Sequence, residues 1–130
     1  MATSFERKWR KWLGELKERV PLNKPVPVRR IKRPILAKCA SAKTPDKLEP
    51  QLGTTDLVNG KFLIQISAVE SKATQIDTLV HEWAHCVAYE AQRKSKTVWT
   101  HDALFGLAYA QVYRAFYEEP NPYLGESDRV

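Results

Sequence analysis

A tight turn that leads into a strand and then a long helix constrains this fold more than any other part of the sequence. Asn59-Gly60 is a two-residue hairpin signal, because both positions tolerate positive φ. The next segment, 61–67, alternates apolar and polar residues, which predicts a strand with one buried face. A helix then extends to roughly residue 92, and its buried stripe is made of Ile76, Leu79, Val80, Trp83 and Val87. A hairpin strand followed by an amphipathic helix predicts an α+β domain.

Local signals suggest where the two later helices begin and end. Ser67-Ala-Val-Glu70 has the form of a capping box, which predicts that the long helix starts there. Residues 93–100 are polar and are interpreted as a turn region. A last helix is expected from Asp102, a good N-cap, up to the prolines that begin at Pro120.

The N-terminal region predicts a basic amphipathic helix over 4–20, with Ser4 as a possible N-cap. Its apolar positions contain Trp9 and Trp12, and we expect this face to pack on the core, although a membrane-surface helix would have a similar pattern. Prolines end the helix, and residues 26–31 suit a short edge strand, where proline is tolerated. Residues 33–55 are interpreted as loop or irregular strand.

Length and composition predict one soluble domain. The 130 residues suffice for a single core, with its principal part at about 56–119. No apolar run approaches the roughly 20 residues that span a bilayer, and the charged N-terminus lacks the pattern of a secretion signal. Cys39 and Cys86 are interpreted as reduced thiols. We therefore expect a cytoplasmic protein without a membrane partner.

Charge is distributed unevenly along the chain. Residues 1–50 hold 14 Lys and Arg against 5 Asp and Glu, whereas residues 51–130 hold 7 against 10. Such asymmetry is typical of a polyanion-binding surface, and the densest basic cluster is Arg29, Arg30, Lys32 and Arg33. These four are the candidates for nucleic-acid binding. The alternative, which we favour, is that basic side chains solvate a surface helix and an edge strand.

The long helix contains the pattern H-E-x-x-H, at His81, Glu82 and His85. Residues four apart on an α-helix lie on one face, so both imidazoles can bind one tetrahedral zinc ion. The carboxylate of Glu82 can reach a water in the open coordination position, whose pKa zinc lowers to roughly 7. Glu82 is therefore the candidate general base of a zinc hydrolase.

A catalytic zinc site needs three protein ligands and one open position. The chain has 3 histidines, and the last of them, His101, stands at the predicted junction of loop and helix. His101 is therefore the candidate third ligand. The alternatives are Glu90, which lies on another side of the same helix, and the carboxylates of Asp102, Glu118 and Glu119.

The segments His81-Glu-Trp-Ala-His85 and Thr100-His101-Asp-Ala-Leu-Phe105 together resemble the SprT-like (Spartan-like) zinc metallopeptidases. In that family H-E-x-x-H is followed by H-G-x-x-F or a similar run that opens a helix. The resemblance covers roughly residues 56–117. It implies that His101 is the third ligand, that Phe105 packs under the site, and that the strand 61–67 is the edge strand along which an extended substrate lies.

The chain departs from the family pattern at two places. Asp102 replaces the usual glycine, and no Cys-rich zinc ribbon follows the last helix. The chain therefore looks like the short form of phage and prophage proteins, which would place it in the host cytoplasm. Tyr109, Tyr113 and Tyr117 recur one turn apart on the last helix. One of them, with Tyr113 and Tyr109 as candidates, could stabilise an oxyanion, but we favour core packing for the row.

The sequence thus predicts a minimal zincin-like domain, with a small antiparallel or mixed sheet, an active-site helix and a C-terminal helix. The expected activity is hydrolysis of peptide bonds in a protein or peptide substrate, with one Zn²⁺ per chain. Two alternatives stay open. The first is a polyanion- or nucleic-acid-binding protein with a structural zinc site, and the second is an amidase acting on cell-wall peptide.

Overall fold

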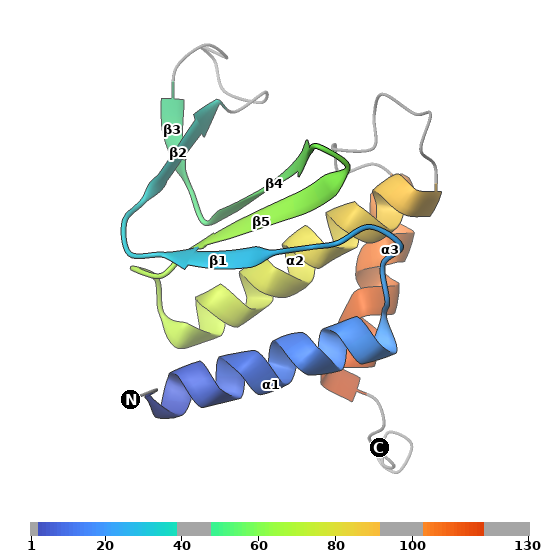
Figure 1. Cartoon of the computed structure of the whole chain (residues 1–130), viewed down its shortest axis with the longest axis horizontal. Coiled ribbons are helices and arrows are strands. Elements are labelled where there is room, and N and C mark those ends of the chain that lie inside the picture. The colour runs from blue at the N-terminus through green and yellow to red at the C-terminus, as the bar shows by residue number, and fades with distance from the viewer. Residues whose placement is uncertain (1–2, 39–47, 92–102, 119–130) are drawn as a thin grey trace. The chain divides into compact units, whose positions relative to one another are not determined.

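The computed structural model describes residues 3–38, 48–91 and 103–118 (Figure 1). Within these ranges the chain combines helices with a small mixed sheet and a separate two-stranded hairpin, so the α+β prediction is confirmed. In chain order the elements are α1 (Ser4–Arg19), β1 (Val28–Ile31), β2 (Ile35–Lys38), β3 (Leu48–Gln51), β4 (Gly53–Val58), β5 (Lys61–Ser67), α2 (Lys72–Ala91), α3 (Ala103–Tyr113) and the π-helix η1 (Arg114–Glu118).

The chain divides into two compact units. One comprises residues 24–83 and holds all five strands with the first part of α2. The other comprises residues 1–23 and 84–130 and holds α1, the last part of α2, α3 and η1. That the whole chain is one domain stays a prediction.

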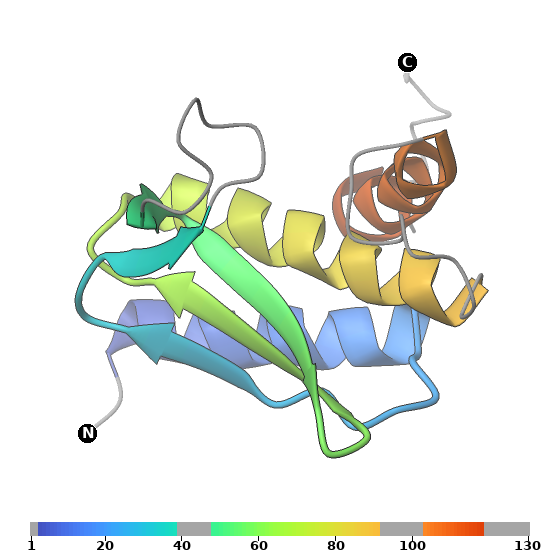
Figure 2. The same cartoon turned by 90° about the horizontal axis from the view of Figure 1, so that it is seen from above.

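The three-stranded sheet has the order β1-β5-β4. β4 pairs with β5 in antiparallel register, and β1 pairs with β5 in parallel register (Figure 2). Asn59 and Gly60 connect β4 to β5 with φ of 50° and 75°, so the predicted hairpin turn is confirmed. Because a two-residue turn fixes which residues lie opposite one another, Asn59-Gly60 also fixes the register of β4.

β5 is the central strand, and its inner face is the core of the sheet. Phe62, Ile64 and Ile66 are 0% exposed, as the alternation predicted, and each contributes about 1.5–3 kcal/mol by burial. The implied placement of the strand 61–67 at an edge is wrong, because β1 and β4 flank it on both sides. The edges are β1 and β4.

β1 confirms the predicted edge strand near the prolines. The carbonyls of Pro25 and Pro27 accept hydrogen bonds from the N–H groups of Phe62 and Ile64 at 2.9 and 3.1 Å, so the ladder continues where proline has no N–H of its own to donate. The interpretation of 33–55 as loop or irregular strand is wrong for much of the segment. It contains β2 and β3, which pair antiparallel, and the start of β4.

α2 begins later than the sequence suggested. Ser67 is the last residue of β5, and its hydroxyl donates to the carbonyl of Arg33 at 3.2 Å, so it caps no helix. The side chain of Ser71 instead accepts the N–H of Thr74 at 3.2 Å. The capping-box prediction at Ser67-Glu70 was therefore wrong by one turn.

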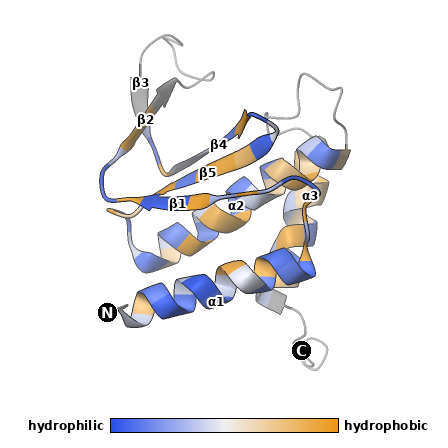
Figure 3. Cartoon of the chain, viewed as in Figure 1, coloured by the Kyte–Doolittle hydropathy of each residue, from blue (hydrophilic) through white to orange (hydrophobic). Residues whose placement is uncertain are grey.

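α1 is amphipathic, as its polar and apolar stripes show (Figure 3). Its N-cap is Thr3 and not the predicted Ser4, and Thr3 forms a capping box with Glu6. Trp9 and Leu16 are buried. At the other end, Arg19 donates to the carbonyl of Ala115 at 3.0 Å and so joins α1 to η1.

Among the residues that the structure describes, no helix has the length and apolar character needed to cross a membrane. The predicted turn at 93–100 and the predicted cap Asp102 lie outside the described residues, as does Cys39. Cys86 is fully buried in α2.

Candidate metal centre

The two histidines of the H-E-x-x-H pattern lie on one uninterrupted helix. α2 runs from Lys72 to Ala91, so His81 and His85 are one turn apart on the same face. His85 is 7% exposed, whereas His81 is half-buried. The backbone spacing on which the zinc prediction depends is therefore present.

Glu82 is held by the neighbouring strand. Its carboxyl group is buried, with 7% of the residue exposed, and its Oε1 accepts a hydrogen bond from the Thr55 hydroxyl at 2.6 Å. The Thr55 oxygen also lies 3.4 Å from the carbonyl of Glu82. Thr55 thus fixes the direction of the carboxyl group from β4.

A close approach of β4 to α2 explains why these two side chains meet. A Cβ on Gly53 would lie 2.6 Å from Cγ2 of Thr78 and 2.9 Å from the carbonyl oxygen of Gln65, so only glycine fits there. Two residues along a strand and four along a helix both advance by about 6–7 Å. Contact at Gly53 and Thr78 therefore brings Thr55 opposite Glu82.

Burial sets the proton affinity of Glu82. Desolvation raises the pKa of this carboxyl group from 4.5 to about 7, the hydrogen bond from Thr55 lowers it, and the nearby negative charge of Asp56 raises it. A carboxyl group with a pKa near neutrality can both accept and return a proton at physiological pH.

Phe105 of α3 packs on the ring of His85. The two ring centroids are 4.3 Å apart with an interplanar angle of 33°, and Phe105 is buried. The implied contact of Phe105 with the site is confirmed for His85. Such packing restricts the rotation of the imidazole.

His101, the predicted third ligand, lies outside the described residues, and so do Asp102 and Glu119. Of the alternatives, Glu90 is engaged elsewhere, because its two carboxylate oxygens accept the N–H of Asn23 at 2.9 and 2.8 Å. Within the described ranges, no group of three or more His, Cys, Asp or Glu side chains is arranged to hold a metal ion. His101 stays a prediction.

The tyrosine row of α3 and η1 differs from the favoured interpretation. Tyr109 is half-buried, but Tyr113 and Tyr117 are 43% and 39% exposed, so the core-packing prediction was wrong for the last two. The row begins beside His85, since Tyr109 stacks on Phe105 with ring centroids 5.8 Å apart and Phe105 packs on His85.

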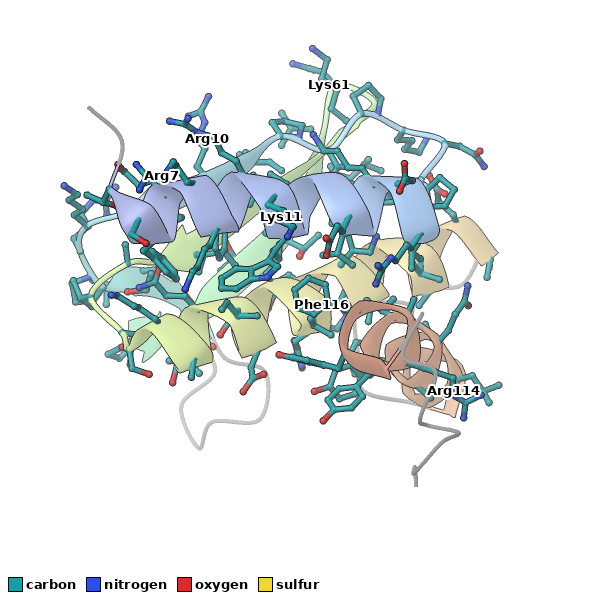
Figure 4. The ribbon with its side chains drawn as sticks, turned by 90° about the horizontal axis from the view of Figure 1, so that it is seen from below. Arg7, Arg10, Lys11, Lys61, Arg114 and Phe116 are labelled. Atoms are coloured by element: carbon teal, nitrogen blue, oxygen red, sulfur yellow. The ribbon has the colours of Figure 1, made fainter. Side chains whose placement is uncertain are left out.

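The basic residues are only partly available for a polyanion. Arg29, Lys32 and Arg33 are exposed, but the Nε of Arg30 donates to Gln75 at 2.9 Å, which makes Arg30 a structural residue of β1. On the other unit, Figure 4 shows Arg7, Arg10 and Lys11 projecting outward from α1. These α1 residues lie within the basic first 50 residues but outside the cluster of four candidates.

Thr55, the hydrogen-bond partner of Glu82, was not among the predicted site residues. The signal was present, because a two-residue turn at Asn59-Gly60 places Val58 opposite Lys61 and therefore Thr55 opposite Ile64. A residue opposite Ile64 faces the same side as Ile64, and that side packs on the helix. Continuing the hairpin register through the segment interpreted as loop would have found it.

No family model, curated protein or solved structure matches this chain.

Proposed function

We propose that this chain is a zinc-dependent peptidase in which His81, His85 and His101 hold the metal and Glu82 is the general base. The observation that carries the proposal is the buried carboxyl group of Glu82, which Thr55 orients at 2.6 Å between two histidines of one helix. A zinc site with a purely structural role needs no carboxylate there. A buried carboxylate that has no catalytic use would only destabilise the fold.

The donor set suits zinc. Imidazole nitrogens one turn apart on a helix are a frequent pair of ligands for this ion. The ring of His85 is fixed by Phe105 at 4.3 Å, which lowers the entropic cost of placing its nitrogen. Two ligands come from α2, and the third is assigned to His101 from the sequence.

In this proposal Glu82 moves the proton. Zinc, when bound, supplies Lewis acidity for the attacking water and for the scissile carbonyl. Glu82 accepts a proton from the water and later donates it to the leaving amine. Thr55 keeps Oε1 of Glu82 in place throughout, and burial keeps the pKa of this carboxyl group near the value that both transfers require.

The free edge of β4 is the surface on which we place an extended substrate. The N–H of Ser67 donates to the carbonyl of Leu52 at 2.9 Å, so Leu52 and Ser67 are a hydrogen-bonded antiparallel pair. Because hydrogen-bonded and non-hydrogen-bonded pairs alternate, Gly53, Thr55 and Leu57 direct their backbone N–H and C=O groups away from β5. In the described part of the sheet, β4 has a neighbour on one side only.

The test is a protease screen of zinc-loaded wild type and Glu82→Gln. Glutamine keeps the shape of the side chain but cannot accept the proton, so we expect normal zinc content and hydrolysis lower by at least about 10²-fold. Glu70→Gln, a matched change outside α2, should retain full activity. Equal activity of Glu82→Gln and wild type would refute the proposed mechanism.

The same screen separates the alternatives. Cleavage of cell-wall peptides in place of unmodified polypeptides would identify an amidase. Zinc binding without hydrolysis of either substrate class would leave a structural metal site and would direct attention to the basic surface residues.

A further inference from the structure

The row of aromatic rings on α3 and η1 begins at a candidate metal ligand. Phe105 contacts His85 at 4.3 Å and stacks on Tyr109 at 5.8 Å. Tyr109 contacts Tyr113 at 6.0 Å, and Tyr113 contacts Tyr117 at 4.6 Å. The three separations from Phe105 to Tyr117 lie in the range of favourable aromatic pairs, and the contact with His85 is slightly shorter. The rings therefore form a continuous series along one helix, starting at His85.

The outer rings of this series are more exposed than the inner ones. Phe105 is buried, Tyr109 is half-buried, and Tyr113 and Tyr117 are exposed. Phe116 supports the outer end, because its ring packs edge-on against Tyr117 at 5.0 Å. Large apolar ring faces that are already held by neighbouring rings lose little conformational entropy when a ligand binds.

Gly106 adds an independent observation. It lies inside α3, where glycine is roughly 1 kcal/mol less favourable than alanine, and no described atom lies within 4 Å of a Cβ built on it. Packing among the described residues therefore gives no reason for glycine at this position. Gly106 lies three residues before Tyr109 and seven before Tyr113, so all three lie on one side of the helix. We name Gly106, Tyr109, Ala110, Tyr113 and Tyr117 the aromatic stripe.

Because Gly106 has no side chain, a ligand can approach the helix backbone closely beside the exposed tyrosine rings. An extended peptide presents every second side chain on one side, at intervals of about 6.7 Å. Successive turns of an α-helix are about 5.4 Å apart, so neighbouring side chains of such a peptide can meet neighbouring turns of the stripe.

Charge selects a peptide over a nucleic acid. A protein that binds single strands combines stacking rings with a groove rich in Lys and Arg. The only Lys or Arg in α3 and η1 is Arg114, and all five residues of the stripe are uncharged. Figure 4 shows Arg114 projecting outward from the helix.

We propose that the aromatic stripe is a substrate subsite that takes apolar or aromatic side chains of an extended peptide. The proposal rests on the proposed peptidase function, because it uses the contact of Phe105 with His85 to connect the stripe to a proposed metal ligand. It assigns a substrate class, polypeptides with alternating apolar residues, to that same site.

Direct binding tests the subsite without requiring turnover. The protein is full-length Glu82→Gln loaded with zinc. The probes are two fluorescein-labelled dodecapeptides, one with Phe or Leu at every second position and one with Ser at those positions. We expect the apolar peptide to bind at least about 10-fold more tightly, the scale of two aromatic contacts. Adding Tyr113→Ala and Tyr117→Ala should remove this preference, whereas Tyr113→Phe and Tyr117→Phe should keep it.

A matched pair of glycine variants controls for folding. Gly106→Gln and Gly14→Gln each replace a glycine inside a helix at a site with no described atom within 4 Å, so both should stabilise the protein. Only Gly106→Gln should weaken binding of the apolar peptide. Loss of affinity in a variant with a raised melting temperature is not explained by unfolding.

Three results would overturn the subsite. The first is an unchanged affinity for the apolar peptide in the folded Tyr113→Ala, Tyr117→Ala variant. The second is an equal change of that affinity in Gly106→Gln and Gly14→Gln. The third is stripe-dependent binding of a dT12 oligonucleotide that is tighter than binding of either peptide. A failure of the proposed peptidase function can be distinguished from a failure of the subsite. In that case the stripe would still prefer the apolar peptide, but wild type and Glu82→Gln would show the same rate of peptide hydrolysis.

Discussion

Burial of Glu82 beneath β4 connects one carboxyl group to two measurable quantities. The first is the pH dependence of hydrolysis, and the second is the pH dependence of stability. Both follow from desolvation opposed by the single hydroxyl of Thr55.

Replacing Thr55 with valine should shift the pH profile. Valine keeps the shape of the side chain but donates no hydrogen bond. Because the hydrogen bond favours the charged form of Glu82, its loss should raise the pKa of Glu82 and move the acid limb of kcat/KM to higher pH. Thr54→Val is the matched control, since Thr54 bonds Gln65 at 3.5 Å and not Glu82. An unmoved acid limb in Thr55→Val would mean that Glu82 is not the group that titrates.

In zinc-depleted protein, Glu82 should make stability depend on pH. Its folded-state pKa of about 7 lies above the unfolded value near 4.5, so the folded chain binds more protons between these values. Stability therefore falls as pH rises through this window and stays reduced above it, by up to about 3 kcal/mol. Glu82→Gln should be more stable than wild type at pH 8, with the gain lost at pH 4. Urea unfolding with a chelator at both pH values measures this, and a gain independent of pH would contradict it.

At the scale of elements, Gly53 sets the distance between β4 and α2. Gly53→Ala places a methyl group 2.6 Å from Thr78 and 2.9 Å from a backbone oxygen, so the strand must shift at a cost of about 1–3 kcal/mol. Gly14→Ala, in open space on α1, should instead stabilise by about 0.5–1 kcal/mol. Thermal unfolding of the two variants measures the contrast. If Gly53→Ala is neutral, the contact between β4 and α2 is not tight.

The elements that sequence patterns predicted are those whose signals are local. The turn at Asn59-Gly60, the inner face of β5 and the C-terminal end of α2 follow from residue type and spacing alone. The pairing of β2 with β3 and the central position of β5 depend on partners distant in sequence, which no local pattern encodes. The helix starts were misplaced at Ser4 and Ser67 because several serines and threonines near each end compete to cap it.

The candidate site shows the same division between local and tertiary information. Spacing alone placed His81, Glu82 and His85 on one helix. The burial of Glu82, its partner Thr55 and the exposure of Tyr113 depend on packing between elements, which the sequence alone did not predict.

For the whole molecule, zinc should contribute to stability as well as to catalysis. A ligand that binds only the folded chain stabilises it by about 2.7 kcal/mol at a concentration 100 times its Kd. We expect one zinc ion per chain at neutral pH, and a chelator should lower Tm. His81→Ala and His85→Ala should each abolish both effects. His101→Ala should do the same, and full zinc content in that variant would remove His101 from the ligand set.

The open edge of β4 also has a consequence for how the protein behaves in concentrated solution. An edge strand whose backbone groups have no partner strand can pair with a second copy of itself. Leu57 and Val58 are exposed near the tip of the hairpin, where they would favour such pairing. Lys61, opposite Val58 in the register, places a positive charge close to these apolar side chains. Because charged side chains at a sheet edge disfavour pairing with another chain, replacing Lys61 with an apolar residue should increase self-association through β4.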